Sequence, residues 1–303
     1  TQSKPLIGGI LNLNMPSATV DFTGTGNRIG RLSGTTAQLT FTNPATNTLG
    51  LGSDYTTDIQ PLTGRMATVF SDTPYLRVTN ALSLVNDGTI NNVSGQWHRV
   101  GSLSLSGTGS VVLNGDTPLR LRSSTSLAPV TVDITSTTDN ASFHLQTRDS
   151  GTIQGSLTGA NTTLDFMAAD TLRIGAAGLR NDGANSLTSL HDMRVEQTIR
   201  QDGALQVDRL TLETFGNIIL TDANNRIGTL EGLAHTATGS ITGNVEIVDG
   251  AGGLVLSGGI GGPLFRTINI RTVGDLTLAA GTAVSATAPD GRNNPNDTTE
   301  ELK

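Results

Sequence analysis

The chain has 303 residues, of which 15% are charged, 3% are aromatic and 37 are glycine, and its net charge is −7. The acidic balance argues against partners that need clustered Lys and Arg, such as nucleic acid or an anionic membrane. The absence of cysteine excludes disulfides, thiolate metal sites and a cysteine nucleophile. No run of 18 apolar residues is present, so the sequence predicts no membrane-spanning helix.

The first segment, residues 1–18, is expected to be an N-terminal cap or an assembly segment. Its apolar stretch is short and is interrupted by Gly8 and Gly9, so it does not read as a signal peptide. The candidate residues for a contact between subunits are Leu6, Ile7, Ile10 and Leu11.

Residues 19–287 are expected to form a β-solenoid, because one phrase occurs twice. Residues 20–34 read VDFTGTGNRIGRLSG and residues 218–232 read IILTDANNRIGTLEG. Both copies alternate apolar and polar residues, pass through small or amide residues typical of a turn, and end in Arg-Ile-Gly-x-Leu-x-Gly. Such recurrence is typical of one structural unit stacked many times along a chain.

Short alternating runs bounded by glycine support the same fold class. Residues 100–107 (VGSLSLSG) and 273–281 (VGDLTLAAG) are examples, in which leucines would point inward and Ser or Thr outward. We predict an all-β, right-handed parallel β-helix, with an antiparallel β-sandwich as the alternative that Asn-Gly and Asp-Gly pairs keep open. The leucines expected in the core are Leu103, Leu105, Leu276 and Leu278.

Two tracts lack this alternating pattern. Loop insertions are expected near residues 36–75, which are rich in Thr, Asn and Pro, and residues 288–303 have the composition of a polar tail or linker.

Residues 86–92 (NDGTINN) and 101–115 (GSLSLSGTGSVVLNG) resemble repeats of autotransporter passengers, and residues 220–230 (LTDANNRIGTL) resemble repeats of filamentous-haemagglutinin-like exoproteins. The resemblance implies a right-handed parallel β-helix on a bacterial cell surface, with an adhesive or scaffolding role. Two features depart from these families. The Asn-Pro-Asn tripeptide of the secretion domain occurs only at residues 294–296, and this sequence ends in EELK where autotransporters end in a membrane barrel.

The ionisable residues give little sign of catalysis. The histidines, which share no metal-binding spacing, are expected to be solvated or in loops: His98, His144, His191 and His235. The run 191–196 (HDMRVE) would place His191 on one strand face and Asp192 on the other, and we interpret it as a salt-bridged outer face. The nearest carboxylate pair for sugar chemistry, Asp165 and Asp170, lacks surrounding aromatic residues.

One spot combines aromatic, basic and hydrogen-bonding groups: Trp97, His98 and Arg99 are candidates for surface recognition, with packing at a coil corner as the alternative. The leading functional hypothesis is a secreted or cell-surface bacterial protein with a structural or adhesive role. Its expected partners are other copies of itself or components of a cell surface or extracellular matrix, and we expect no catalytic, cofactor or metal site. The alternatives are a subunit of an extracellular filament and a polysaccharide-cleaving enzyme.

Overall fold

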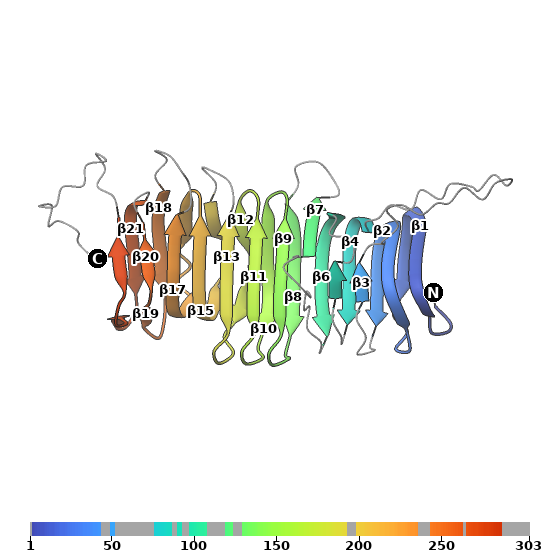
Figure 1. Cartoon of the computed structure of the whole chain (residues 1–303), viewed down its shortest axis with the longest axis horizontal. Coiled ribbons are helices and arrows are strands. Elements are labelled where there is room, and N and C mark those ends of the chain that lie inside the picture. Colours follow the sequence, from blue (N-terminus) through green and yellow to red (C-terminus); the bar gives the residue numbers. More distant parts are fainter. Residues whose placement is uncertain are drawn as a thin grey trace, which may run out of the picture.

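The computed structural model is an elongated stack of β-strands that lie side by side, with the N-terminal segment at one end and the C-terminal segment at the other (Figure 1). The structure describes residues 2–43, 49–51, 76–86, 90–92, 97–107, 119–123, 129–192, 198–235, 243–262 and 265–286. Within these ranges the chain contains strands and turns and no helix. The all-β prediction is therefore confirmed.

The strands of the first half are β1 (Ile7–Phe22), β2 (Arg28–Asn43), β3 (Leu49–Leu51), β4 (Leu76–Asn86), β5 (Ile90–Asn92), β6 (His98–Gly107), β7 (Leu119–Ser123), β8 (Val130–Ser136), β9 (Ser142–Thr147), β10 (Gly151–Leu157) and β11 (Thr163–Ala168). Those of the second half are β12 (Leu172–Asn181), β13 (Leu187–Asp192), β14 (Thr198–Gln201), β15 (Leu205–Thr214), β16 (Asn217–Leu220), β17 (Arg226–His235), β18 (Gly243–Asp249), β19 (Leu254–Leu256), β20 (Gly259–Gly261), β21 (Phe265–Thr272), β22 (Leu276–Leu278) and β23 (Ala283–Ser285).

Strand pairing identifies the stack as a parallel β-solenoid. Every pairing among the described strands is parallel. Strands inside the stack, such as β11, pair with one strand of the coil before and one of the coil after, here β9 and β13. Hairpins would give antiparallel neighbours, so the alternative of an antiparallel sandwich is wrong.

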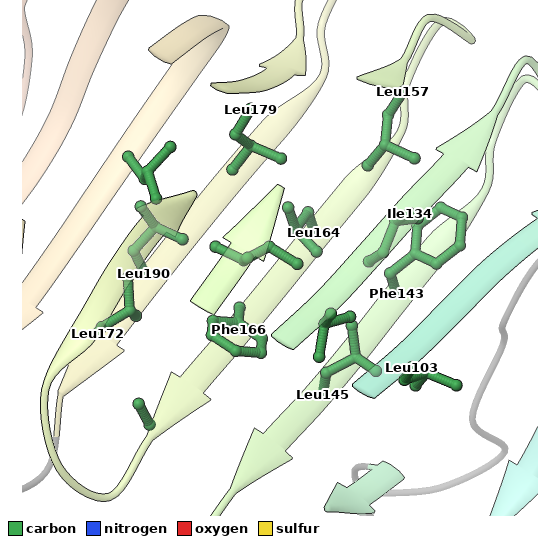
Figure 2. Close-up of a cluster of buried hydrophobic side chains, with 14 of the residues drawn as sticks. Leu103, Ile134, Phe143, Leu145, Leu157, Leu164, Phe166, Leu172, Leu179 and Leu190 are labelled. Carbon is green, nitrogen blue, oxygen red and sulfur yellow. The ribbon is translucent and has the colours of Figure 1, made fainter. Parts of the chain in front are cut away.

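Alternation of side chains builds the core. In β9, β11 and β13 every second residue is buried, and the residues between them face outward. Figure 2 shows inward side chains of successive coils gathered in one apolar interior. Phe143 pairs with Leu164, and Leu145 pairs with Phe166, so rings and leucines alternate between neighbouring coils. Full burial of such a side chain contributes about 1.5–3 kcal/mol.

The leucines expected in the core are buried on β6 but exposed on β22, near the C-terminal end of the stack. Leu103 and Leu105 are buried. Leu276 and Leu278 lie in register with the buried Leu254 and Leu256, yet both are exposed, at 37% and 49%, so the expectation that they lie in the core is wrong. They belong to β22, which pairs with β19 and with no further strand among the described residues.

The repeated phrase forms a coil corner around a buried asparagine. Asn225 Oδ1 accepts the backbone N–H of Leu205 at 2.8 Å. Its Nδ2 donates to the carbonyl of Leu220 at 3.2 Å and to that of Val248 at 3.0 Å. One amide side chain thus satisfies backbone groups of three successive coils, where the strands end and the ladder is interrupted.

Two of the predicted segment boundaries fall inside strands of the structure. The division after residue 18 falls inside β1, which pairs with β2 on both sides of that point. Residues 36–43 belong to β2, so the expected insertion does not begin at residue 36. Most of that insertion, residues 44–48 and 52–75, and the tail, residues 288–303, lie outside the described residues.

Candidate functional site

Ionisable side chains form a ladder along one outer face of the solenoid. His144 Nε2 lies 3.0 Å from Asp165 Oδ2, and Asp165 Oδ1 lies 3.1 Å from His191 Nε2. His191 Nδ1 lies 3.0 Å from Glu213 Oε2. We call these four residues the histidine–carboxylate ladder. Imidazoles and carboxylates alternate along it, so each group lies beside one of the opposite type.

Strand register brings the ladder together. His144 on β9 is paired with Asp165 on β11, and His191 on β13 is paired with Glu213 on β15. Asp165 is itself in register with Ser189, which is two residues before His191. Residues two apart on a strand share a face, so the Asp165 carboxylate reaches His191 along a diagonal. The ladder therefore links four successive coils.

Two neighbouring residues at the end of β13 have shifted pKa values. Desolvation lowers the pKa of His191, but hydrogen bonds and charges from Asp165 and Glu213 outweigh it, so the pKa lies above its usual value of 6.5. Burial raises the pKa of Asp192 to about 6. Hydrogen bonds from Thr214 Oγ1 and from the backbone N–H of Phe215 oppose this rise without cancelling it.

The structure corrects the interpretation of the run that contains these two residues. His191 faces outward and belongs to the ladder, whereas Asp192 points inward and is buried. Placing Asp192 on a salt-bridged outer face is therefore wrong. The signal for the correct orientation is Leu190, because an inward leucine implies that the residue two positions later also points inward. The rest of the run, residues 193–196, lies outside the described residues.

The expectation that the histidines are solvated or in loops is wrong for His98, which is buried, and His144 and His191 are partly exposed on strands. His144 and His191 are far apart in sequence but contact the same carboxylate, that of Asp165. His98 is buried, and His235 ends β17.

The chemistry of the ladder is that of ion pairing. Among the described residues, no group of three or more His, Asp or Glu is arranged to hold a metal ion. The carboxylates considered for sugar chemistry have different surroundings. Both oxygens of Asp165 face imidazoles, whereas Asp170 acts through its charge on Asp192.

The candidate recognition spot is divided between surface and interior. His98 is fully buried, and its Nδ1 accepts the backbone N–H of Leu76 at 3.1 Å. Burial lowers the pKa of His98 to about 4. His98 is thus a packing residue and cannot offer its ring to a ligand at the surface. Trp97 and Arg99 remain partly exposed, and the Arg120 guanidinium carbon lies 5.7 Å from the centre of the Trp97 ring.

Of the four candidate assembly residues, two pack against the core and two are exposed. Leu6 and Leu11 pack against the core. Ile7 is 76% exposed and Ile10 is 45% exposed. They lie in register with Arg28 and Arg31, which places two large apolar side chains on the outer side of the first coil.

Comparison of the chain with protein-family models, with curated proteins and with solved structures finds no match. Among the described residues no helix is long and apolar enough to cross a membrane.

Proposed function

We propose that the protein is a secreted or cell-surface bacterial β-solenoid with a structural and adhesive role and without catalysis. The observation that carries the proposal is the parallel stack of the described strands, whose interior is apolar and whose outward residues form registered columns. A rod of this kind presents many similar contacts along its length, which suits multivalent attachment to an extended surface. The resemblance of its repeats to those of bacterial exoproteins is in keeping with such a role.

The test combines location and attachment. Antibodies against the purified chain should label intact producing cells or the culture medium, and beads coated with the chain should bind to matrix-coated plates more than beads coated with albumin. A panel of neutral and acidic polysaccharides should show no release of reducing ends. Confinement of the protein to the cell interior, or sugar release that depends on Asp165, would overturn the proposal.

A second candidate is a subunit that assembles into filaments. The observation in its favour is the exposure of Ile7 and Ile10 on β1, which pairs with β2 alone among the described strands. Apolar side chains beside an available strand edge favour association with another chain.

Sedimentation and electron microscopy test this second candidate. The variant Ile7→Lys/Ile10→Lys should sediment as a smaller species with an unchanged β-rich spectrum. Ile219→Lys is the matched control, because Ile219 is an exposed apolar residue, 43% accessible, on the distant strand β16. Equal sedimentation of wild type and the double variant would contradict assembly through the first coil.

A further inference from the structure

The last described coil leaves apolar side chains exposed beside free strand edges. Leu276 and Leu278 on β22 are 37% and 49% exposed, although their register partners Leu254 and Leu256 on β19 are buried. Val273, which lies just before β22, is 66% exposed. Among the described strands, β21, β22 and β23 pair only with strands of the preceding coil. Such an edge favours pairing with a further strand.

The first coil can be aligned with the last through the coils between them. Asn27 accepts the backbone N–H of Leu6, as Asn225 accepts that of Leu205, so β1 corresponds to the coil formed by β15 and β16. One column of pairings leads from β15 through β17 and β19 to β22. Another leads from β16 through β18 to β21. A coil equivalent to β1 would therefore fit next to β21 and β22.

Continuing the register of β22 onto β1 of a second copy places leucine on leucine. Leu278 is in register with Leu256, and Leu256 is in register with Leu230. Leu230 occupies the place of Leu32, because each is five residues after its corner asparagine. Leu32 is in register with Leu11. Leu278 of one copy would thus stack on Leu11 of the next.

The column of β21 gives a second apolar match from the same alignment. Ile270 is in register with Ile247, and Ile247 is in register with Leu220. Leu220 occupies the place of Phe22, because each donates its carbonyl to the amide of an asparagine five residues later. Phe22 of a second copy would therefore stack on Ile270. Two separate columns give apolar contacts without any change of register.

The same alignment matches an exposed charge. Asp21 is exposed and forms no ion pair within the part of the chain that the structure describes. In a second copy it would lie beside Asn269, on the opposite side from Glu246, which is in register with Asn269. Glu246 accepts Arg271 Nη2 at 2.7 Å. Arg271 would then lie between two carboxylates, one from each copy.

We propose that the first coil of one copy binds the last described coil of a second copy, so that parallel pairing continues from β21 and β22 onto β1. These strands belong to opposite ends of the stack (Figure 1). The contact joins two different surfaces, and a head-to-tail contact of this kind repeats without closing and produces a filament. The inference rests on the filament candidate above and names the surface that meets β1.

A cross-link tests the register, because the chain has no cysteine of its own. Thr277 would lie beside Ile10 of the next copy, one position before the pair of Leu278 and Leu11. Adjacent strands bring Cα atoms within disulfide range. An equimolar mixture of Thr277→Cys and Ile10→Cys should form a mixed disulfide dimer under mild oxidation. A mixture of Thr277→Cys and Asn14→Cys is the matched control, and it should yield at least tenfold less because Asn14 is four residues further along β1.

Sedimentation tests which two surfaces meet. Leu276→Lys/Leu278→Lys should sediment as a smaller species than wild type, as Ile7→Lys/Ile10→Lys should. When the two variants are mixed, they should form a dimer and no longer species, because each keeps the surface that the other has lost. Formation of this dimer also shows that both variants are folded. Ile219→Lys should assemble like wild type.

Three results would overturn the inference. Filaments of wild type without the disulfide between positions 277 and 10 would refute this partner and leave the filament candidate standing. Failure of the two lysine variants to associate when mixed would do the same. Wild type that remains monomeric at all concentrations would refute the filament candidate as well, while the adhesive role would still stand on the attachment of coated beads.

Discussion

Asn27 and Asn225 make the same hydrogen bonds at equivalent corners of two distant coils. Asn27 Oδ1 accepts the backbone N–H of Leu6 at 2.9 Å, as Asn225 Oδ1 accepts that of Leu205. Asn27 Nδ2 donates to the carbonyl of Phe22, five residues earlier, and Asn225 Nδ2 donates to that of Leu220, also five residues earlier. The repetition of the Asn-Arg-Ile-Gly phrase therefore has a physical cause, which is a buried amide that connects consecutive coils.

Replacing Asn225 with alanine is expected to destabilise the solenoid by about 3 kcal/mol, because it leaves buried N–H and C=O groups without partners. Thermal unfolding followed by circular dichroism measures the effect. Asn224→Ala is the control, since Asn224 is exposed and its side chain donates to Asp222 on the surface, and we expect a change within about 0.5 kcal/mol. Equal effects of the two substitutions would contradict the linking role.

The sequence allowed the fold to be predicted because alternation and recurring turns are local signals. Leu103 and Leu105 alternate with polar residues, and both are buried as expected. The same alternation, with Val100 inside, also indicates that His98 points inward, although the composition of Trp97, His98 and Arg99 suggested a surface.

The histidine–carboxylate ladder could not be predicted in the same way, because it depends on the length of each coil. Asp165 follows its partner His144 by one coil of 21 residues, the separation that also joins the neighbouring pair Ser142 and Thr163. Glu213 follows His191 by 22 residues. Coils of different length keep these side chains on one face because the turns take up the difference, and turn lengths are not encoded by alternation.

His191 is expected to titrate above its usual pKa of 6.5, because Asp165 and Glu213 both favour the imidazolium. Its folded-state pKa is raised, so its contribution to stability is present below the unfolded pKa and is lost as pH rises through the folded value. Nuclear magnetic resonance titration should show Glu213→Gln lowering the pKa of His191. Glu246→Gln removes a carboxylate of the distant strand β18 and should leave it unchanged.

The same titration should show His98 with a pKa of about 4, because burial disfavours its charged form. A His98 resonance that titrates near the usual value of 6.5 would mean that its ring is solvated, contrary to the packing described here.

Because the pKa of Asp192 is raised in the fold, we expect the protein to lose stability as pH rises toward neutrality. Its pKa is about 6 in the fold against 3.8 for an unperturbed group, so folding favours the protonated form. The stabilising contribution is fully present below 3.8 and is lost as pH rises through about 6, at most about 3 kcal/mol in all. Asp192→Asn should flatten this part of the pH profile in urea unfolding, because an amide can still accept from Phe215 and donate to Thr214. Asp275→Asn, at an exposed position, should keep the wild-type profile.

Substitution of Gly155 tests whether close backbone packing between neighbouring coils excludes side chains larger than that of glycine at this position. It lies in β10 with a φ of +126°, and a Cβ atom there would be 2.0 Å from the carbonyl oxygen of Ile134 on β8. Gly155→Ala is therefore expected to lower stability by at least about 2 kcal/mol, through backbone strain and displacement of a neighbouring coil. Gly232 in β17 is the matched control, because its added Cβ would meet only Thr211 Cγ2 at 3.7 Å. Gly232→Ala should leave stability unchanged or raise it by about 0.4–1 kcal/mol, since alanine restricts the unfolded chain. The expected result in thermal unfolding is a loss of stability for Gly155→Ala and no loss for Gly232→Ala, and similar values for both would show that β8 and β10 are not packed as closely as described.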